Sequence, residues 1–459
     1  METIELVLNG APVRTRVAST QTTLLDFLRE RGLTGAKEGC AEGECGACTV
    51  VMVADDAGRT AYRPFNSCLM FLPQAAGHEI ITVEALARDG HLSDAQAAMA
   101  AAGGSQCGYC TPGFVMSLFA EHYRPGRTGP CETEALAGNL CRCTGYRPIR
   151  DAARSLGMPR DDRFLARLRQ PAPALAAFDV DGFARPATVA EGIALLEREP
   201  SAKLLAGGTD MAVESNLRAT RWPRLISVEA IAELQGFDEN ALRVRIGAAL
   251  PLADIGRHWT SAPAVIHDWL TLFASPPIRN RATLGGNLAT ASPIGDSAPL
   301  LLALDARVET AGPGGRRSIP VDEFFAGYRQ TALASHELIV AVEIPKPLPA
   351  NIGFYKVAKR RADDISTVAV AIGLDRHANG HVRAARFAFG GVAATPIRLH
   401  EAERGIAGRL WDESAVERVT KVIQRTVRPL SDHRGSSDYR LQVAQRLVEK
   451  FAVETGAWR

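Results

Sequence analysis

The chain has 459 residues, of which 46% are hydrophobic and 23% are charged, and its formal net charge is +2. This composition is typical of globular proteins and excludes a disordered or fibrous chain, while the length predicts about three domains at about 150 residues each. The near balance of charge gives no indication of a nucleic-acid-binding or polybasic membrane surface. The first residues lack the features of a secretory signal, and no run of about 18 apolar residues occurs, so we expect a cytoplasmic chain without a membrane span.

The first 85 residues predict a small α+β module. Alternating apolar residues on both sides of the turn dipeptide Asn9-Gly10 predict a hairpin over residues 3–17. Thr22-Thr23 can cap a helix that ends at Gly32, and residues 49–53 are typical of a further strand.

Four further segments follow in the chain. Residues 86–157 have apolar residues at helical spacing, with Thr111-Pro112 as a typical helix start, and predict a helical bundle. Residues 158–180 are rich in Arg, Asp, Pro and Ala and predict a linker. Short strands alternating with helices predict a domain over residues 181–345, and strands followed by two amphipathic helices predict another over residues 346–459. The sequence therefore predicts an α+β multidomain protein.

All nine cysteines lie between Cys40 and Cys143. An odd number cannot pair completely within one chain, and disulfides are disfavoured in the cytoplasm. Cysteines clustered in such a chain more often bind metal.

The first four cysteines follow the spacing Cys40-x4-Cys45-x2-Cys48, and nineteen residues separate Cys48 from Cys68. Four glycines from Gly35 to Gly46 allow the backbone to approach the sulfur atoms and to donate N–H groups to them. This spacing is typical of plant-type [2Fe–2S] loops. A structural zinc site is the alternative, but zinc loops usually contain two C-x2–4-C pairs, and this set fits them poorly.

A second set of four cysteines has the form Cys107-x2-Cys110 and, thirty residues later, Cys141-x-Cys143. Both pairs precede predicted helices, whose N-terminal N–H groups and positive dipole end stabilise thiolates. From the residues alone, zinc and an iron–sulfur cluster are equally compatible with this set. Cys131 is left over, and no role is predicted for it.

Two glycine-rich stretches point to a nucleotide cofactor. An apolar strand runs into Gly207-Gly208-Thr209, where backbone N–H groups could close on a phosphate; a tight turn is an equally good interpretation. Residues 281–296 combine paired glycines, hydroxyl side chains and Asp296, which suits a diphosphate and a ribose hydroxyl. A plain Gly/Ser/Pro-rich loop is the alternative there.

Three longer motifs carry a resemblance to a known family: CAEGECGACTV from Cys40, QCGYCTPGFVMS around Cys107, and NLCRCTGYRPI around Cys141. They resemble the two-cluster module of the molybdenum hydroxylases, which include xanthine dehydrogenases, aldehyde oxidases and carbon monoxide dehydrogenases. The resemblance implies one [2Fe–2S] cluster in a ferredoxin-like β-grasp domain and a second in a helical domain, the latter nearer the molybdenum centre. The implied ligands are Cys40, Cys45, Cys48 and Cys68 for the first cluster and Cys107, Cys110, Cys141 and Cys143 for the second.

The glycine-rich stretches resemble the FAD domain of the same family, whose fold is of the vanillyl-alcohol oxidase type. The resemblance places residues 204–211 and 283–287 at the diphosphate and Asp296 at the sugar. Phe273 would pack on the isoalloxazine ring, although a core Phe is the alternative, and Leu338 and Lys356 would lie beside the flavin. The implied FAD contacts are Leu204, Leu205, Ala206, Gly207, Gly208, Thr209, Asp210, Met211, Phe273, Thr283, Leu284, Gly285, Gly286, Asn287, Asp296, Leu338 and Lys356.

The resemblance covers nearly the whole chain and leaves no stretch for molybdopterin or for the carboxylate that activates the molybdenum-bound oxygen. We therefore expect no catalytic residue for hydroxylation here, and a separate molybdopterin-binding large subunit. This arrangement resembles that of bacterial two-chain xanthine dehydrogenases and implies a dimer of two-chain units, a heterotetramer.

The implied activity is electron transfer from a partner that oxidises hypoxanthine to xanthine and xanthine to urate. Electrons would pass through the two clusters to FAD and then to NAD⁺. The charged loop over residues 359–366 resembles the loop where NAD⁺ meets the flavin, although a solvated loop is the alternative. Two other functions remain open: the same relay in a hydroxylase of another N-heterocycle or an aldehyde, and a zinc-stapled scaffold or redox sensor.

Overall fold

The computed structural model describes residues 3–457, which form two compact units. The first unit contains the chain up to Ala232 together with Pro251–His258 and Ala274–Ala282. The second contains Glu233–Leu250, Trp259–Phe273 and the chain from Thr283 onward. Within the described residues, every helix is too short or too polar to cross a bilayer.

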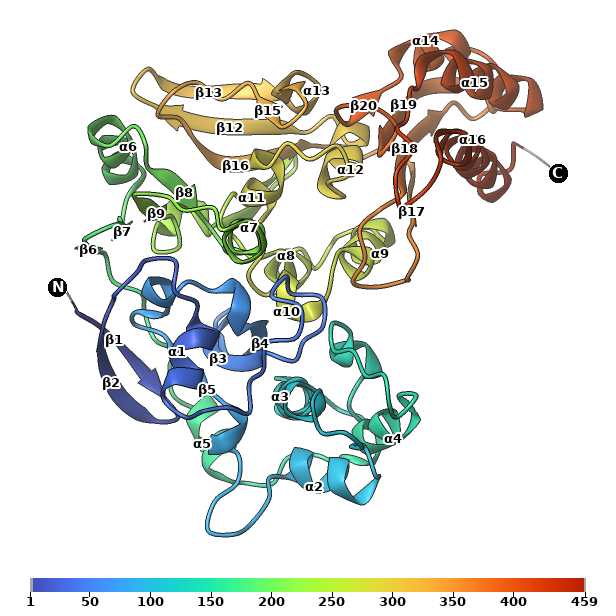
Figure 1. Ribbon diagram of the computed structural model, residues 1–459. Coiled ribbons are helices and arrows are strands. Elements are labelled where there is room, and N and C mark those ends of the chain that lie inside the picture. The colour runs from blue at the N-terminus through green and yellow to red at the C-terminus, as the bar shows by residue number, and fades with distance from the viewer. Residues whose placement is uncertain (1–2, 458–459) are drawn as a thin grey trace. The chain divides into compact units, whose positions relative to one another are not determined.

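The first unit begins with a five-stranded sheet of order β2-β1-β5-β3-β4 (Figure 1). The predicted hairpin is present, and both residues of its Asn9-Gly10 turn have positive φ. Helix α1 begins after Thr23, which forms a capping box with Asp26, and Gly32 follows its end. The bounds are β1 Thr3–Leu8, β2 Ala11–Arg16, α1 Leu24–Glu30, β3 Thr49–Asp56, β4 Arg59–Asn66 and β5 Glu79–Ile81, with the short 3₁₀ helix η1 at Ser67–Leu69.

Strand β3 is buried on both faces because each face packs against a different layer. Val50 and Met52 belong to the core that includes α1, whereas Val51 and Val53 pack with the helices that follow in the chain. Alternate residues of a strand point to opposite faces, so one strand joins the sheet to both layers.

The helical bundle packs on the second of these faces. Helix α3 is buried along almost its whole length and carries Pro112 in its first turn, as predicted, and α4 carries Pro148 in its first turn. Within the segment predicted as a linker, Asp162 caps an additional helix, and Phe164 in that helix packs edge-on against Phe119. The bounds are α2 Asp94–Ala101, α3 Thr111–His122, α4 Arg147–Ser155 and α5 Arg163–Leu168.

The rest of the first unit contains a four-stranded sheet of order β6-β7-β9-β8, in which β9 runs parallel to β7 and β8. Helix α8 is joined to the first sheet by Arg63, whose guanidinium contacts both Asp254 carboxylate oxygens at 2.6 and 2.7 Å. The bounds are β6 Phe178–Val180, β7 Phe183–Arg185, α6 Val189–Arg198, β8 Lys203–Leu205, α7 Met211–Arg218, β9 Leu225–Ser227, α8 Leu252–His258 and α10 Pro276–Arg279.

The second unit contains an antiparallel five-stranded sheet of order β10-β11-β16-β12-β13. Strand β16 is buried nearly throughout because it pairs with β11 on one side and β12 on the other. The bounds are β10 Phe237–Glu239, β11 Arg243–Gly247, α9 Ala264–Leu272, α11 Leu284–Ala289, α12 Ser297–Ala303, β12 Arg307–Gly312, β13 Gly315–Pro320, α13 Val321–Phe324, β14 Phe325–Gly327, β15 Gln330–Thr331 and β16 Leu338–Pro345.

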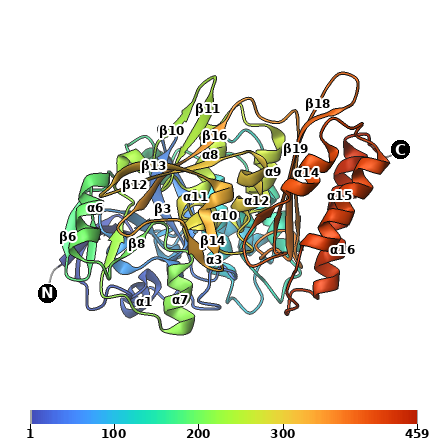
Figure 2. The same ribbon diagram turned by 90° about the horizontal axis from the view of Figure 1, so that it is seen from above.

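A second antiparallel sheet, β17-β18-β19-β20, completes this unit. Helices α14, α15 and α16 cover one of its faces (Figure 2), and α12 contacts strands β18 and β19. The two predicted terminal helices are present as α15 and α16, and the sequence did not predict α14, which is only seven residues long and has no side-chain cap. The bounds are β17 Asn351–Val357, β18 Val368–Arg376, β19 Val382–Gly390, β20 Ile397–Arg398, α14 His400–Ile406, α15 Glu413–Thr426 and α16 Ser437–Glu454.

Candidate iron–sulfur centres and flavin site

The four cysteines of the first set come together in two pairs, and we call them the plant-type quartet (Cys40, Cys45, Cys48 and Cys68). The Sγ atoms of Cys48 and Cys68 are 3.2 Å apart. The side chains of Cys40 and Cys45 hydrogen bond to each other, and the Cys45 backbone N–H lies 3.4 Å from Cys40 Sγ. Three of these cysteines lie between α1 and β3, whereas Cys68 lies in η1.

Glycines let the backbone wrap closely around this quartet. A Cβ on Gly39 would lie 2.8 Å from Cys45 Sγ. Gly43 has φ +86°, and a Cβ there would lie 2.5 Å from Leu69 Cδ1. Larger residues would therefore push this loop away from the sulfur atoms, which is the reason for the glycine-rich sequence.

The hydrogen bonds prepare one thiol of each pair for ionisation. The side-chain hydrogen bond from Cys45 and the backbone N–H groups of Glu42, Glu44 and Cys45 lower the pKa of Cys40 to about 5. The hydrogen bond from Cys68 lowers the pKa of Cys48. The thiolate is the form that binds metal, so this environment suits ligands of an iron cluster.

The second set also forms two pairs, and we call it the helical-domain quartet (Cys107, Cys110, Cys141 and Cys143). The hydrogen-bonded side-chain pairs are Cys107 with Cys143 and Cys110 with Cys141. The first pair of cysteines precedes α3, and the second precedes α4. Cys107 and Cys143 are exposed.

Thr144 adds hydrogen bonds to this quartet. Burial alone would raise the pKa of Cys141, but hydrogen bonds from the Thr144 side chain and backbone N–H lower it. The Thr144 Oγ1 and N atoms lie 3.1 and 3.4 Å from Cys141 Sγ. Such bonds to sulfur are one means by which proteins set the reduction potential of an iron–sulfur cluster.

The two-by-two pairing fits a two-iron cluster at each quartet. A [2Fe–2S] cluster takes two protein ligands on each of two irons, whereas a structural zinc ion takes four ligands around one point. Cys131 stands apart from both sets: it is buried, and burial raises its pKa to about 11, so it remains a protonated thiol.

The loops that carry the two quartets are joined through backbone atoms. The N–H of Leu140 donates to the Cys45 carbonyl at 3.0 Å. Asn139 donates through Nδ2 to the Gly46 carbonyl at 3.1 Å and to Thr49 Oγ1 at 3.2 Å. A Cβ on Gly113 of α3 would lie only 2.2 Å from the Gly46 carbonyl oxygen.

Sequence reasoning missed Asn139, although it directly precedes Leu140 and the Cys141-x-Cys143 pair. Its Oδ1 accepts a hydrogen bond from Ser117 Oγ at 2.6 Å, and the residue is buried. A buried amide with both ends satisfied is the type of residue that fixes one loop against another.

The first predicted flavin stretch, residues 204–211, lies in the first unit between β8 and α7. A Cβ on Gly207 would lie 1.8 Å from the Arg281 carbonyl oxygen. Gly208 has φ +81°, and its Cβ would lie 3.0 Å from the Leu69 carbonyl oxygen. Close packing thus requires both glycines in any case.

The other predicted flavin residues belong to the second unit. Thr283 caps α11 and accepts a hydrogen bond from the Gly286 N–H at 3.0 Å. Phe273 ends α9 and packs edge-on against Trp269. Leu338, which begins β16, is buried in the sheet.

Asp296 and Lys356, predicted separately from the sequence, form a buried ion pair with an Nζ–Oδ2 distance of 2.7 Å. Ser366 Oγ donates to the other Asp296 oxygen, and Lys356 also donates to the Leu272 carbonyl at 2.9 Å. Burial raises the pKa of Asp296, an effect that Lys356 and Ser366 oppose. This pair fixes the end of α9 and the start of α12 against β17.

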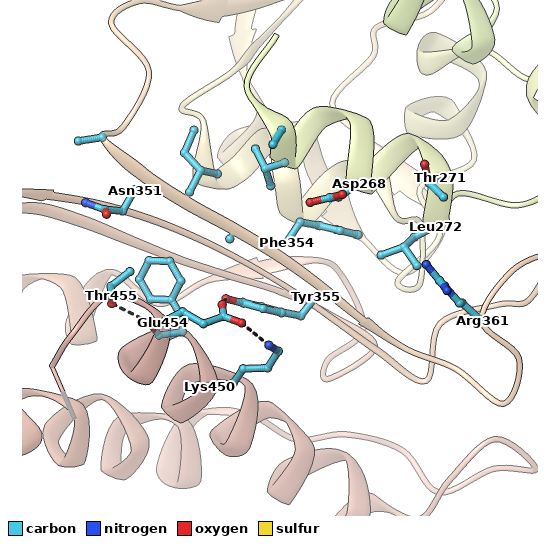
Figure 3. Close-up of a pocket in the computed structure, with 16 residues that line it drawn as sticks. Asp268, Thr271, Leu272, Asn351, Phe354, Tyr355, Arg361, Lys450, Glu454 and Thr455 are labelled. Atoms are coloured by element: carbon cyan, nitrogen blue, oxygen red, sulfur yellow. Dashed lines mark hydrogen bonds and ion pairs between the residues drawn. The ribbon is translucent and has the colours of Figure 1, made fainter. Parts of the chain in front are cut away.

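A pocket of about 610 Å³ lies beside β17, between α9 and α16 (Figure 3). Lys450 and Glu454 pair on one side of it, and Tyr355 donates its hydroxyl to Glu454. Asp268 of α9 and Arg361, from the charged loop noted in the sequence, also line it. The pocket is therefore mixed in charge rather than strongly basic.

Four family models match the chain. They are the 2Fe-2S iron-sulfur cluster binding domain over residues 6–72, the [2Fe-2S] binding domain over 82–154, the FAD binding domain in molybdopterin dehydrogenase over 177–347, and the CO dehydrogenase flavoprotein C-terminal domain over 353–455. Among solved structures, carbon monoxide dehydrogenase from Hydrogenophaga pseudoflava matches with 31% identity and a TM-score of 0.55, over 60% of this chain and 96% of that chain. The chain belongs to the molybdenum hydroxylase family.

Other members of the family are similar over most of this chain. Xanthine dehydrogenase 2 of Arabidopsis thaliana is 34% identical over 88% of this chain. Quinoline 2-oxidoreductase from Pseudomonas putida 86 is 28% identical, with a TM-score of 0.56, over 61% of this chain and 99% of that chain. This chain spans 36% of the length of the Arabidopsis relative. The predicted fold class, two [2Fe–2S] domains and an FAD-binding domain are confirmed.

Proposed function

We propose that this chain is the electron-transfer part of a xanthine dehydrogenase, in which the molybdenum cofactor lies on a partner chain. Hypoxanthine and xanthine would be oxidised on that partner, with NAD⁺ as final acceptor. The observation that carries the proposal is the pair of cysteine quartets, each arranged two by two, on the same chain as the FAD-binding domain. When bound, the clusters supply one-electron transfer and the flavin converts it to the two-electron reduction of NAD⁺.

The exposure of the helical-domain quartet supports the proposal that electrons from the partner chain enter there. Cys107 and Cys143 are exposed, so this quartet can lie near a partner chain. Leu140 and Tyr109, which neighbour these cysteines, are large side chains that also stay exposed. An exposed apolar group beside an electron-transfer site is what a docking surface for the partner requires.

The contacts between the two quartets support electron transfer from the helical-domain quartet to the plant-type quartet. Cys45 and Leu140 are joined by one backbone hydrogen bond, and Asn139 holds the same two loops together. At the plant-type quartet, Leu69 follows the ligand Cys68 and lies against Gly208 of the predicted FAD loop. The chain's own residues thus join the loops of the two quartets to each other and the plant-type quartet to the predicted FAD loop.

The choice of NAD⁺ rests on the charged loop and its surroundings. Arg361 of this loop lines the pocket beside β17, the strand that also carries Lys356. The resemblance to xanthine dehydrogenases, at 30–34% identity for those of Gallus gallus and Arabidopsis thaliana, supports the same acceptor. A dimer of such two-chain units in the cytoplasm belongs to the same proposal.

A hydroxylase of another N-heterocycle or of an aldehyde is the second candidate, because quinoline 2-oxidoreductase also matches this chain. The substrate pocket of either enzyme would lie on the partner chain. The two candidates therefore differ in the partner and share every role proposed for this chain.

The proposal is tested on anaerobically purified chain and on its complex with a co-expressed molybdopterin-binding chain. We expect about four iron, four labile sulfides and one FAD per chain, since each [2Fe–2S] cluster holds two of each. The complex should form NADH with xanthine. A colourless, zinc-containing chain would contradict the electron-transfer role, whereas NADH formation with quinoline or an aldehyde but not with xanthine would favour the second candidate.

A further inference from the structure

One side chain of the first unit connects the predicted FAD loop to both halves of the plant-type quartet. Asn216 lies in α7, the helix that begins directly after the Gly207–Asp210 loop. Its Nδ2 donates to the Ala41 carbonyl at 2.9 Å and to the Cys68 carbonyl at 2.9 Å. These two acceptors are 175 and 148 residues away from it along the chain.

The two acceptors belong to different halves of the quartet. Ala41 follows Cys40, which pairs with Cys45, and Cys68 pairs with Cys48. One amide nitrogen, with its two hydrogens, therefore holds one member of each ligand pair. Only an Asn or Gln side chain provides two donors on one uncharged nitrogen.

The backbone of Ala41, which provides one of the two acceptors, is held in an unfavourable conformation. Ala41 has φ +57°, in the left-handed region that residues other than glycine adopt at a cost of about 1 kcal/mol or more. This conformation must be held by surrounding contacts, and one contact to its carbonyl is the Asn216 amide.

The predicted FAD stretch before α7 has a second connection to the residues that follow Cys68, through Gln74. Gln74 is fully buried, donates through Nε2 to the Ala206 carbonyl at 3.1 Å, and accepts the Phe71 N–H. Gln74 thus binds Ala206 within the predicted FAD stretch of residues 204–211, and Asn216 holds the helix that follows Asp210. Asn216 lies five residues into α7, about 7.5 Å along the axis from the first residue.

We propose that Asn216 is a positioning residue that fixes the plant-type cluster relative to the flavin by binding the backbone of one ligand from each cysteine pair. The inference rests on the proposed electron-transfer function and names a residue on which electron transfer from the plant-type cluster to the flavin depends. Asn216 touches the ligand backbone and not the reacting groups, so it acts through Cys40 and Cys68.

The test compares Asn216→Leu and Asn216→Asp, both close to Asn in size, in the cofactor-loaded full chain. The matched control is Leu217→Ala, because Leu217 is the next residue of the same helix and its side chain is exposed. The readouts are iron and FAD content, the electron paramagnetic resonance signal and midpoint potential of each cluster, and amide hydrogen exchange of residues 39–48. The helical-domain cluster is the internal reference.

We expect both variants to retain iron and FAD and to change only the plant-type signal. Loss of the amide should accelerate exchange in residues 39–48 about fivefold, as expected for the loss of a typical hydrogen bond. Asn216→Asp should also lower the midpoint potential more than Asn216→Leu, because reduction adds negative charge near the new carboxylate. Asn216→Ser, which keeps one donor, should give an intermediate change and serves if the Leu variant does not fold.

An unchanged signal, potential and exchange rate in Asn216→Leu, with cofactors intact, would overturn this inference alone. Equal changes at both clusters, or the same changes in Leu217→Ala, would also overturn it, since they indicate a general loss of stability. A wild-type chain without iron or FAD would instead overturn the proposed function.

Discussion

The two cysteine quartets share a two-by-two pairing of thiols but differ in their exposure. Cys48 and Cys68 of the plant-type quartet are 2% and 3% exposed, whereas Cys107 and Cys143 of the helical-domain quartet are exposed. The first is enclosed by a glycine-rich loop, η1 and α7, and the second lies where two helices begin. Similar sets of four cysteines thus differ in exposure according to the elements that cover them.

The largest effect is expected when one predicted ligand is removed from each quartet, which tests whether each set of cysteines holds its own cluster. Cys45→Ser should abolish the plant-type paramagnetic resonance signal, and Cys107→Ser should abolish the helical-domain signal, because the thiolate is the metal ligand. FAD should remain bound in both variants, as measured by flavin release in acid. If both signals survive in either variant, the ligand assignment is wrong.

The rate at which a chelator removes iron tests whether the difference in cysteine exposure protects one cluster. With an iron chelator under reducing conditions, we expect the helical-domain cluster to be lost about tenfold faster than the plant-type cluster, which corresponds to ~1.4 kcal/mol in the free energy of opening. Loss of each signal is followed by paramagnetic resonance. Equal rates would show that burial of Cys48 and Cys68 gives no protection.

Gly113→Ala tests the close contact between the quartets. The new Cβ would meet the Gly46 carbonyl, so α3 or the plant-type loop must shift, and overpacking of this kind costs about 1–3 kcal/mol. Urea unfolding of the cofactor-loaded chain measures the loss. The control is Gly129→Ala, where a Cβ would meet nothing within 4 Å and stability should change by less than about 0.5 kcal/mol.

The smallest effect is expected at Tyr109, whose hydroxyl donates to the Glu38 carbonyl and so joins the two cysteine loops at the surface. Tyr109→Phe should cost about 0.5 kcal/mol, the low end for a hydrogen bond, because the side chain is half exposed. Amide exchange near residue 38 measures the change, with the exposed Tyr328→Phe as control. A loss of stability as large as that in Gly113→Ala would show that the contact between the two cysteine loops depends on this surface hydrogen bond.

Much of the fold was predictable because its signals are local. Asn9-Gly10 and the Thr23 cap each determine a turn or helix start within a few residues, and the structure has both. Helix α14 was missed because it is short and has no side-chain cap, so neither periodicity nor a start signal marks it.

The site was predictable only as far as cysteine spacing and long motifs reach. Spacing identifies the two sets of cysteines but cannot show which thiols pair, because Cys68 in η1 is brought to Cys48 by tertiary structure. Asn139 and Asn216 were missed for the same reason: each acts on carbonyl groups 93 or more residues away. The predicted FAD residues remain predictions, and for Gly207 and Gly208 packing alone already explains the glycines.

The approach of Gly113 to the Gly46 carbonyl means that main-chain atoms, together with the Asn139 side chain, set the spacing between the loops that carry the two quartets. Tunnelling rates fall steeply with distance, and this close main-chain contact limits how far the substitution of neighbouring side chains can change the interval. Replacing the neighbouring apolar residues with others of similar size should therefore alter how firmly the modules hold together long before it alters how quickly charge crosses from one to the other.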